Sequence, residues 1–164
     1  MANSSIVGKA KNKIIRDFIK DPDFLAAIGS PNADKLKPEQ YLNTHIFNYH
    51  QNPFTINDVT TFITIQVHIP QTYDLNKTYV TPSVEIWIIS HEKHMVVDNV
   101  PKITENRNDY ISELIDNKLN GKSGFGIGEL KLSCNIEGSF QQDYVYRKMV
   151  FEGTDLNKSL CFDE

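Results

Sequence analysis

The residues whose type and spacing come nearest to a chemical site are two histidines at the end of an apolar run. His91 and His94 stand three positions apart, with Glu92 and Asp98 nearby, so a metal site can be imagined there. On an extended chain, however, residues three apart point to opposite faces, and no Cys or carboxylate stands at a spacing typical of metal ligands. We therefore expect no metal ion. The other histidines are interpreted as half-exposed strand or turn residues: His45, His50 and His68.

A glycine-rich segment raises the question of a phosphate site. Gly121-Lys122-Ser123 ends like the P-loop of nucleotide-binding proteins, but the position five residues before the Gly-Lys pair, where this motif needs a glycine, is Asp116. The predicted order is also helix then strand, whereas a P-loop joins a strand to a helix. Gly124-Phe125-Gly126-Ile127-Gly128 fails as a dinucleotide-binding fingerprint for the same reason. We expect no cofactor and interpret the segment as a helix-to-strand connection.

No arrangement typical of nucleophilic catalysis is visible in the sequence. Such a site needs a Ser or Cys beside a His that a carboxylate orients, often on a sharp strand-to-helix turn. The two cysteines, Cys134 and Cys161, are too few for a disulfide framework and are interpreted as free thiols, with Cys134 in the core. The prediction is no enzyme and no catalytic residue, although a site assembled from distant residues stays open.

Two groups of residues are candidates for protein contacts. Arg107 and Asp109 open a predicted helix, where the positive end of the helix dipole suits an aspartate but not an arginine. Either Arg107 takes part in a surface ion pair or it reaches a neighbouring protein chain. The second group lies on and before one predicted strand: Phe140, Tyr144, Tyr146, Arg147 and Met149. Tyr, Arg and Met are enriched at protein interfaces, although most aromatic residues of a sheet belong to its core.

Two long helices must help to position these residues. The first is predicted from Ser4 or Ser5 to the Asp21-Pro22 pair, because its apolar residues fall at helical spacing. Asp23 to Ile28 is expected to add a short helical turn closed by Gly29, and Pro31 to Pro38 to form a loop. The second long helix is predicted from Thr104 to Leu119, with Thr104 or Asn106 as its cap.

Five segments are predicted to be strands: Thr44–Tyr49, Thr60–Ile69, Val84–Ile89, Glu129–Cys134 and Asp143–Glu152. Val84–Ile89 is apolar on nearly both faces, which is typical of a central strand. The Ile136-Glu137-Gly138-Ser139 segment is expected to connect the last two strands as a hairpin. The order predicts one α+β domain over residues 1–164, with a mostly antiparallel sheet of about five strands and two main helices packed on it.

The composition is that of a soluble globular domain, with 23% charged and 40% hydrophobic residues. Residues 1–20 contain five Lys or Arg and one Asp, so a basic helix accompanies an acidic remainder in a chain of net charge −4. Such a helix can serve self-association or bind an anionic partner, whereas the mild overall acidity argues against a dedicated nucleic-acid binder. No segment has the pattern of a membrane span or signal peptide, so we expect a cytosolic protein without a membrane partner.

The order of these elements and several local phrases resemble the tail terminator and neck proteins of tailed bacteriophages, small α+β subunits that cap the tail tube and join it to the head. The phrases are, in chain order, Tyr41–Phe54, the strand Thr60–Ile69, the central strand ending near Ser90-His91, Arg107–Ile111, Phe125–Leu132, Tyr146–Phe151 and Thr154–Asn157. They cover nearly the whole chain, and their order carries the specificity. The sequence departs from the pattern at Asn48, where the related phrase has Pro, and in the Pro31 to Pro38 insertion.

This resemblance implies a structural virion protein, assembled in the host cytoplasm, with no catalytic site and no cofactor. Family members form rings, typically hexamers, that meet the last tail-tube ring on one face and the head connector on the other, while DNA passes through without sequence-specific binding. The partners implied are therefore further copies of this chain, the tail tube protein and the head connector or neck proteins.

The residues expected to touch neighbouring rings lie in two segments, the loop Gln71 to Pro82 and the glycine-rich segment Gly121 to Gly128. The basic first helix and the acidic body are expected to pair adjacent subunits. The full set of candidate interface residues is Asn76, Lys77, Thr78, Tyr79, Arg107, Asp109, Phe125, Gly126, Tyr146 and Arg147.

Three alternatives stay open. The chain can be another neck or tail-completion component, a cytosolic protein-binding accessory domain without catalytic activity, or an enzyme with a dispersed site. A terminator should form closed rings or bind tube ends, an accessory domain should stay small, and an enzyme should be stabilised by a specific small molecule or metal.

Overall fold

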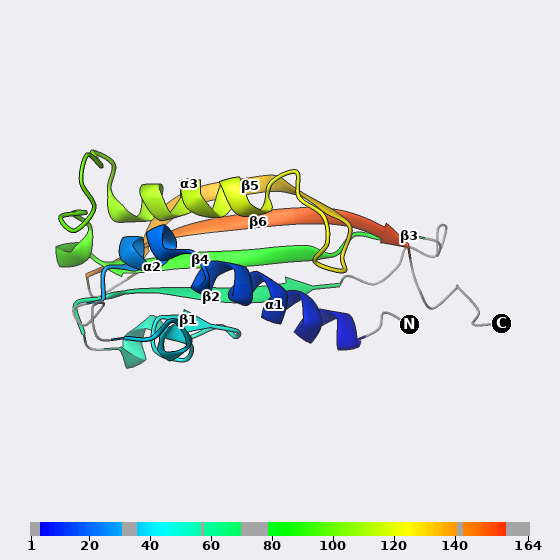
Figure 1. Cartoon of the computed structure of the whole chain (residues 1–164), viewed down its shortest axis with the longest axis horizontal. Helices are drawn as coiled ribbons and strands as arrows, with labels where there is room; N and C mark the ends of the chain where they lie inside the picture. The colour runs from blue at the N-terminus through cyan, green and yellow to red at the C-terminus, as the bar shows by residue number, and fades with distance from the viewer. Residues whose placement is uncertain (1–3, 31–35, 57, 70–78, 141–142, 157–164) are drawn as a thin grey trace.

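The computed structural model describes residues 4–30, 36–56, 58–69, 79–140 and 143–156. These residues form a layer of helices against a mostly antiparallel sheet, which confirms the predicted α+β fold (Figure 1). The helices are α1 (Ser4–Ile19), α2 (Pro22–Ile28) and α3 (Arg107–Leu119). The strands are β1 (Ile46–Phe47), β2 (Thr61–His68), β3 (Tyr79–Val80), β4 (Ser83–His91), β5 (Glu129–Phe140) and β6 (Tyr144–Leu156). Short 3₁₀ helices lie in the connections: η1 (Pro38–Tyr41), η2 (Pro53–Thr55) and η3 (Glu92–His94).

The sheet places β4 at its centre, as the apolar Val84–Ile89 segment predicted. The strand order is β1-β2-β4-β6, with β5 on the far side of β6. β3 pairs with β6 beyond the end of β4, since Val80 lies opposite Asp155 and Ser83 lies opposite Glu152. Because β3 and β4 follow one another along the same side of β6, the sheet is five strands wide. Among the described strands only β1 and β2 run parallel.

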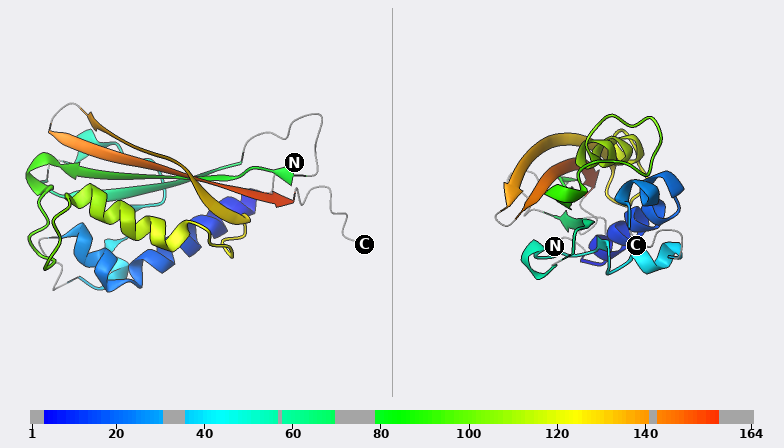
Figure 2. Two further views of the ribbon diagram at one scale, coloured as in Figure 1. Left: turned by 90° about the horizontal axis from the view of Figure 1, so that it is seen from above. Right: turned by 90° about the vertical axis from the view of Figure 1, so that its left-hand side faces the viewer.

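All three helices lie on one face of the sheet (Figure 2). Alternate residues of each long strand point to that face and meet the apolar stripes of α1 and α3. The largest buried apolar side chains of this core are Ile14, Phe18, Phe24, Ile28, Ile46, Ile63, Ile65, Ile86, Ile88 and Phe151. Each such burial contributes about 1.5–3 kcal/mol before conformational entropy is counted, so this one layer supplies the main driving force for folding.

The predicted short helix closed by Gly29 is confirmed as α2. Asp21 caps it, because its Oδ1 accepts hydrogen bonds from the backbone N–H of Asp23 at 2.9 Å and of Phe24 at 3.2 Å. Gly29 then ends it in the left-handed conformation with φ 65°. The Lys118 ammonium of α3 lies 2.5 Å from the Asp21 carboxylate and joins the two helices at this cap.

The predicted hairpin connection at residues 136–139 is wrong. β5 continues through these residues to Phe140, and Gly138 lies opposite Tyr146 in the ladder. A Cβ at position 138 would lie 2.5 Å from the Tyr146 Cζ, so this glycine makes room for a neighbouring ring instead of forming a turn. The strands join further on, where Asp143 has a positive φ of 66°.

The prediction that Cys134 belongs to the core is also wrong. The register of β5 and β6 shifts between Leu132 and Cys134, so Leu132 faces the helices while Cys134 lies opposite Val150 on the other face. A β-bulge of this kind adds one residue to a strand and reverses the alternation beyond it. Cys134 is therefore half-buried, with a free thiol.

Other element boundaries also differ from the predictions, and β6 continues to Leu156, beyond the predicted end at Glu152. The strand predicted at Thr44–Tyr49 is reduced to Ile46–Phe47. The second long helix begins at Arg107 and not at Thr104, because the Asn106 side chain accepts the N–H of Asp109 at 2.9 Å and so caps it. In the described part of the chain, no helix is long and apolar enough to cross a bilayer.

Candidate interaction surfaces

Arg107 is buried inside the domain, and its Nη2 lies 3.8 Å from Oδ1 of the exposed Asp98, so it takes part in an ion pair from the buried side. Its side chain is 1% exposed. Nε donates to the His94 carbonyl at 2.6 Å, Nη1 to the Ala27 carbonyl at 2.6 Å and Nη2 to the Val96 carbonyl at 2.8 Å. The guanidinium therefore fastens the end of α2 and the loop before α3 to the start of α3. The ion pair that the sequence suggested is therefore present with Asp98, although Arg107 itself is buried. The expectation of an intersubunit contact is corrected, because the guanidinium donors already bind within the chain.

The two histidines that could be imagined as metal ligands point to different partners. His91 Nδ1 accepts the backbone N–H of Lys93 at 3.1 Å. His94 lies 3.1 Å from the Gly29 carbonyl through Nε2 and 2.8 Å from the Thr61 hydroxyl through Nδ1. Burial, together with the nearby charge of Arg107, lowers the pKa of His94. Among the described residues no group of three or more His, Cys, Asp or Glu side chains could hold a metal ion.

The glycine-rich segment divides into a buried and an exposed part. Phe125 is 6% exposed and packs in the main core, which corrects the expectation that it is a surface contact. Gly126 is exposed and has φ 80°, a backbone conformation that a glycine adopts without strain. Only Gly126 of this candidate pair is thus placed to touch another chain.

The candidates in the loop before β3 fall largely outside the described residues. Asn76, Lys77 and Thr78 are among the residues that the structure does not describe. The backbone of Tyr79 forms the first position of β3 and lies opposite Leu156.

Asp109 and Arg147 come together where the start of α3 meets β5 and β6, while the neighbouring Tyr146 packs against Trp87 on the other face of the sheet. The guanidinium of Arg147 forms ion pairs with Asp109 and Glu137. A cleft of about 460 Å³ lies beside them, lined in part by Asn106, Tyr146 and Arg147. Of the candidate interface residues, Asp109 and Arg147 are the two that the fold joins by a direct contact among the described residues.

Aromatic residues gather on the sheet face opposite the helices. The ring of Trp87 lies 4.9 Å from that of Tyr146 and 6.0 Å from that of Phe140, measured between centroids. Ile136, opposite Lys148 in the ladder, belongs to the same face and is 50% exposed. Toward β2 this face is closed by a smaller cluster, formed by Phe47, Phe62, Ile89 and Tyr144. We define the open face as Trp87, Ile136, Phe140, Tyr146 and Lys148.

Sequence reasoning singled out Tyr146 and Phe140 but missed Trp87 and Ile136. Trp87 was assigned to a central strand that was expected to be buried on both faces. A usable signal was the alternation in β4, where Glu85 and Trp87 stand between the buried Val84, Ile86 and Ile88. Ile136 was missed because it was placed in a turn.

An ion pair lies on the open face. Lys148 Nζ lies 3.0 Å from the Glu85 carboxylate and 5.1 Å from the centroid of the Trp87 ring. The Trp87 indole N–H donates to Glu85 at 2.6 Å. Burial alone would raise the pKa of Glu85, but these two hydrogen bonds and the Lys148 charge outweigh it and hold the pKa below its usual range. The face is thus apolar with one compensated ion pair.

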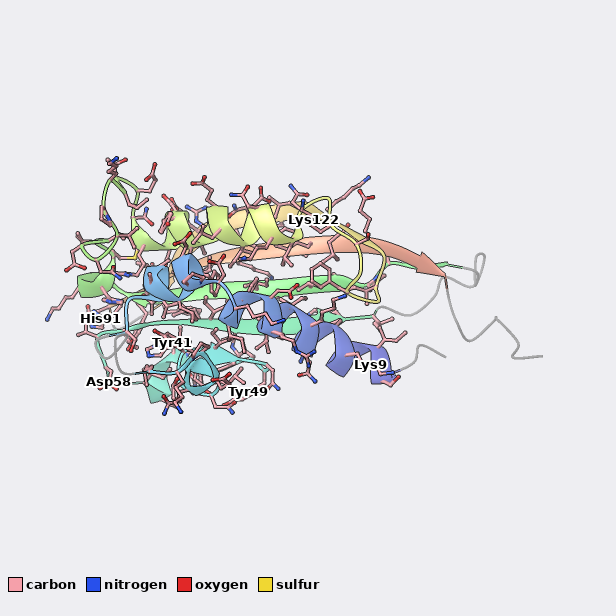
Figure 3. The ribbon with its side chains drawn as sticks, in the orientation of Figure 1. Lys9, Tyr41, Tyr49, Asp58, His91 and Lys122 are labelled. Carbon is pink, nitrogen blue, oxygen red and sulfur yellow. The ribbon has the colours of Figure 1, made fainter. Side chains whose placement is uncertain are left out.

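Charged groups are unevenly placed along the length of the molecule. Lys9 and Lys122 lie toward one end, and Asp58 lies near the other (Figure 3). The exposed acidic residues Glu92, Asp98 and Asp143 belong to the connections at the Asp58 end, where β4 and the β5–β6 hairpin turn.

Comparison with protein families relates this chain to one of them. The model named YomW matches residues 13–152. The chain belongs to the YomW family. That name is of the kind given to prophage proteins and points to a phage-associated protein. No curated protein matches the sequence.

The YomW match contains the elements that build the open face. It spans β1 to β5 and most of β6, the whole of α2 and α3, and the second half of α1. Trp87, Tyr146 and Lys148, as well as Arg107 and its partners, therefore lie within the part of the chain that defines the YomW family.

Proposed function

We propose that this chain is a structural subunit of a phage tail or neck, which caps the tail tube as a ring and offers the surface for joining the head. The YomW family supports a phage association. The resemblance of the ordered sequence phrases to tail terminators supports the finer role, and the open face of the sheet gives such a subunit a surface to bury.

The single observation that carries the proposal is the uncovered aromatic face. All three helices lie on the other side of the sheet, and β5 has a strand partner on one edge alone among the described strands. Trp, Tyr and Phe are among the side chains that protein interfaces favour. Residues 120–122 bond the outer edge of β5 only at Leu130 and Leu132. An assembled ring would cover both this face and the rest of the β5 edge, which an isolated subunit leaves in water.

Charge separation supports the pairing of like subunits. The exposed side of α1 carries Lys9, Lys13 and Arg16, whereas the exposed carboxylates Asp58, Glu92, Asp98 and Asp143 lie at the opposite end. Opposite charges on different surfaces of one subunit suit a heterologous contact, in which each copy binds the next and the ring closes.

The mechanism is then geometric. A ring bound to the last tube ring covers the edges that would accept another tube subunit, so tube growth stops there. Its outer surface differs from that of the tube and provides the docking site for the head connector. No step of this mechanism requires a catalytic residue.

The first experiment is to measure the mass of the purified protein over a range of concentrations, with negative-stain images of the same fractions and of fractions mixed with tail tubes. Closed rings, or density capping tube ends, are the expected result. A protein that stays monomeric and ignores tube ends would contradict the proposal and favour an accessory domain.

A matched pair of substitutions ties the assembly to the open face. Ile136→Glu adds a charge to a half-exposed residue of that face, and Val96→Glu adds the same charge to a 75% exposed residue in the loop before α3. We expect Ile136→Glu to abolish rings or tube capping and Val96→Glu to leave them intact. Equal assembly by both variants would contradict the role of the open face.

A further inference from the structure

A second surface lies between η2 and the start of β2, apart from the open face. It is a cavity of about 990 Å³, lined in part by His45, Phe47, Tyr49, Ile56, Asp58 and Thr60. Figure 3 shows Tyr49 and Asp58 on the β1 side of the sheet. The volume exceeds what one side chain fills and suits a segment of several residues.

The walls of this cavity are held in place by the sheet. The Tyr144 hydroxyl donates to the Ile56 carbonyl at 2.7 Å and to the Asp58 carbonyl at 3.1 Å. Phe47 packs edge-on against Phe62 of β2, with ring centroids 6.0 Å apart. A preformed cavity loses little entropy when a ligand binds.

His45 presents an unused hydrogen-bond acceptor at the cavity. The residue is 9% exposed, and its Nδ1 lies 2.9 Å from the Thr61 carbonyl. A carbonyl can only accept, so Nδ1 carries the proton and Nε2 is an acceptor in the neutral ring. Nε2 has no hydrogen-bond partner among the residues that the structure describes. Nε2 is not enclosed by the protein, so a donor that enters the cavity, from a ligand or from water, can reach it.

The remaining lining defines the chemistry of that ligand. Asp58 is the one charged residue among those described that line the cavity, which therefore offers nothing to neutralise an anion. Most polar groups are neutral hydroxyls and amides, and the apolar groups include Leu36, Phe47 and Ile56. The occupant should be uncharged or cationic, with an apolar side chain and an N–H or O–H donor.

The rim indicates that the occupant is a protein. Tyr49 and Val59 line the cavity and are 46% and 44% exposed, and they are two of the four large hydrophobic side chains that are most exposed in the described part of the chain. These groups extend the apolar contact beyond the cavity mouth, where a small molecule would leave them in water and a protein surface would cover them.

We propose that this cavity binds a non-acidic segment of a partner protein, which places an apolar side chain among Phe47, Tyr49 and Ile56 and donates a hydrogen bond to His45 Nε2. This contact is separate from the open face and does not depend on ring formation.

The experiment uses two capped tripeptide amides as probes and the full chain labelled with ¹⁵N. One probe has a central phenylalanine between two serines, and the other has the same phenylalanine between two aspartates. We expect the neutral probe to produce saturable shifts in the backbone amides of residues 43–47 and 55–60 and to move the His45 Nε2 resonance. The acidic probe should bind at least about tenfold more weakly.

His45→Asn tests the acceptor directly. An asparagine amide can replace the Nδ1–H bond to the Thr61 carbonyl but offers no group at the position of Nε2. We expect its affinity for the neutral probe to fall at least about tenfold while its spectrum away from the cavity stays native. The matched control, His68→Asn, changes an exposed histidine on β2 outside the cavity lining and should bind like the original chain.

Several outcomes would overturn the proposal. These are equal affinity for both probes, unchanged affinity in His45→Asn, shifts that fall outside the cavity, or no saturable binding by either probe. If the same amides shift with protein concentration in the absence of any probe, a second copy of this chain is the occupant instead. Because every readout uses the isolated protein, a failure here leaves the test of ring formation unaffected.

Discussion

Arg107 and Gly29 are in direct contact at the junction of α3 and α2. Gly29 has φ 65°, and a Cβ added to it would overlap the Arg107 guanidinium. The same guanidinium donates to the Ala27 carbonyl at 2.6 Å. Gly29 and Arg107 therefore depend on each other at the end of α2. A substitution of either residue should disturb the position of the other.

Gly29→Ala should destabilise the protein by at least about 2 kcal/mol. The left-handed conformation costs an L-residue about 1–2 kcal/mol, and displacement of Arg107 adds to that cost. The measurement is urea unfolding. Gly8→Ala is the control, because Gly8 lies within α1 with nothing near its missing Cβ, and this change should stabilise by about 0.5–1 kcal/mol. Equal effects at both positions would contradict the account.

Arg107→Lys should destabilise by about 3 kcal/mol, although it keeps the charge. A lysine side chain donates from one nitrogen atom. It cannot bond all three carbonyls that the three guanidinium nitrogens reach. Arg16→Lys on the exposed side of α1 should change the free energy of unfolding by less than about 0.5 kcal/mol. A small effect at position 107 would mean that the buried hydrogen bonds contribute little.

Gly138→Ala should be costly only while Tyr146 is present. The added methyl group meets the Tyr146 ring at 2.5 Å, and overpacking of this kind costs about 1–3 kcal/mol. In a Tyr146→Ala background the same change should cost less than about 0.5 kcal/mol. A double-mutant cycle of unfolding free energies measures the difference, and additive effects would rule out the contact as the cause.

Stability should fall as the pH drops from about 7.5 toward about 5.5. Burial lowers the pKa of His45, and burial with the charge of Arg107 lowers that of His94, so the unfolded chain binds more protons than the folded one in this range. The stabilisation is complete above the unfolded histidine pKa of about 6.5 and is lost below it.

Unfolding in urea at constant ionic strength measures this dependence. The double variant His45→Asn with His94→Asn should be less stable at neutral pH but should lose most of the slope. If the free energy of unfolding of the double variant depends on pH as steeply as that of the original chain, other groups cause the dependence. Asp21 and Glu85 have a lowered pKa, so their carboxylates stabilise the folded state at neutral pH. This stabilisation is lost only below about pH 4, where the carboxyls become protonated.

The sequence by itself determined the elements and their order. The helical spacing in α1 and the Asp21-Pro22 and Gly29 signals depend only on neighbours along the chain, so they predicted α1 and α2 closely. The apolar run at Val84–Ile89 predicted the central strand because apolar residues on both sides of a strand are typical of strands whose two faces are covered. These local and compositional signals were sufficient for the α+β class.

Tertiary structure alone decided what each side chain does. Arg107 has the sequence signature of a surface group, yet three carbonyls from distant segments satisfy it in the core. Gly138 is typical of a turn, yet it lies within β5, where the absence of a side chain leaves room for the Tyr146 ring of the next strand. The bulge near Cys134 reverses the faces of β5, and the cavity at His45 is closed by residues from η2 and β2. Each of these depends on which segments meet in space, and no pattern along the chain records that.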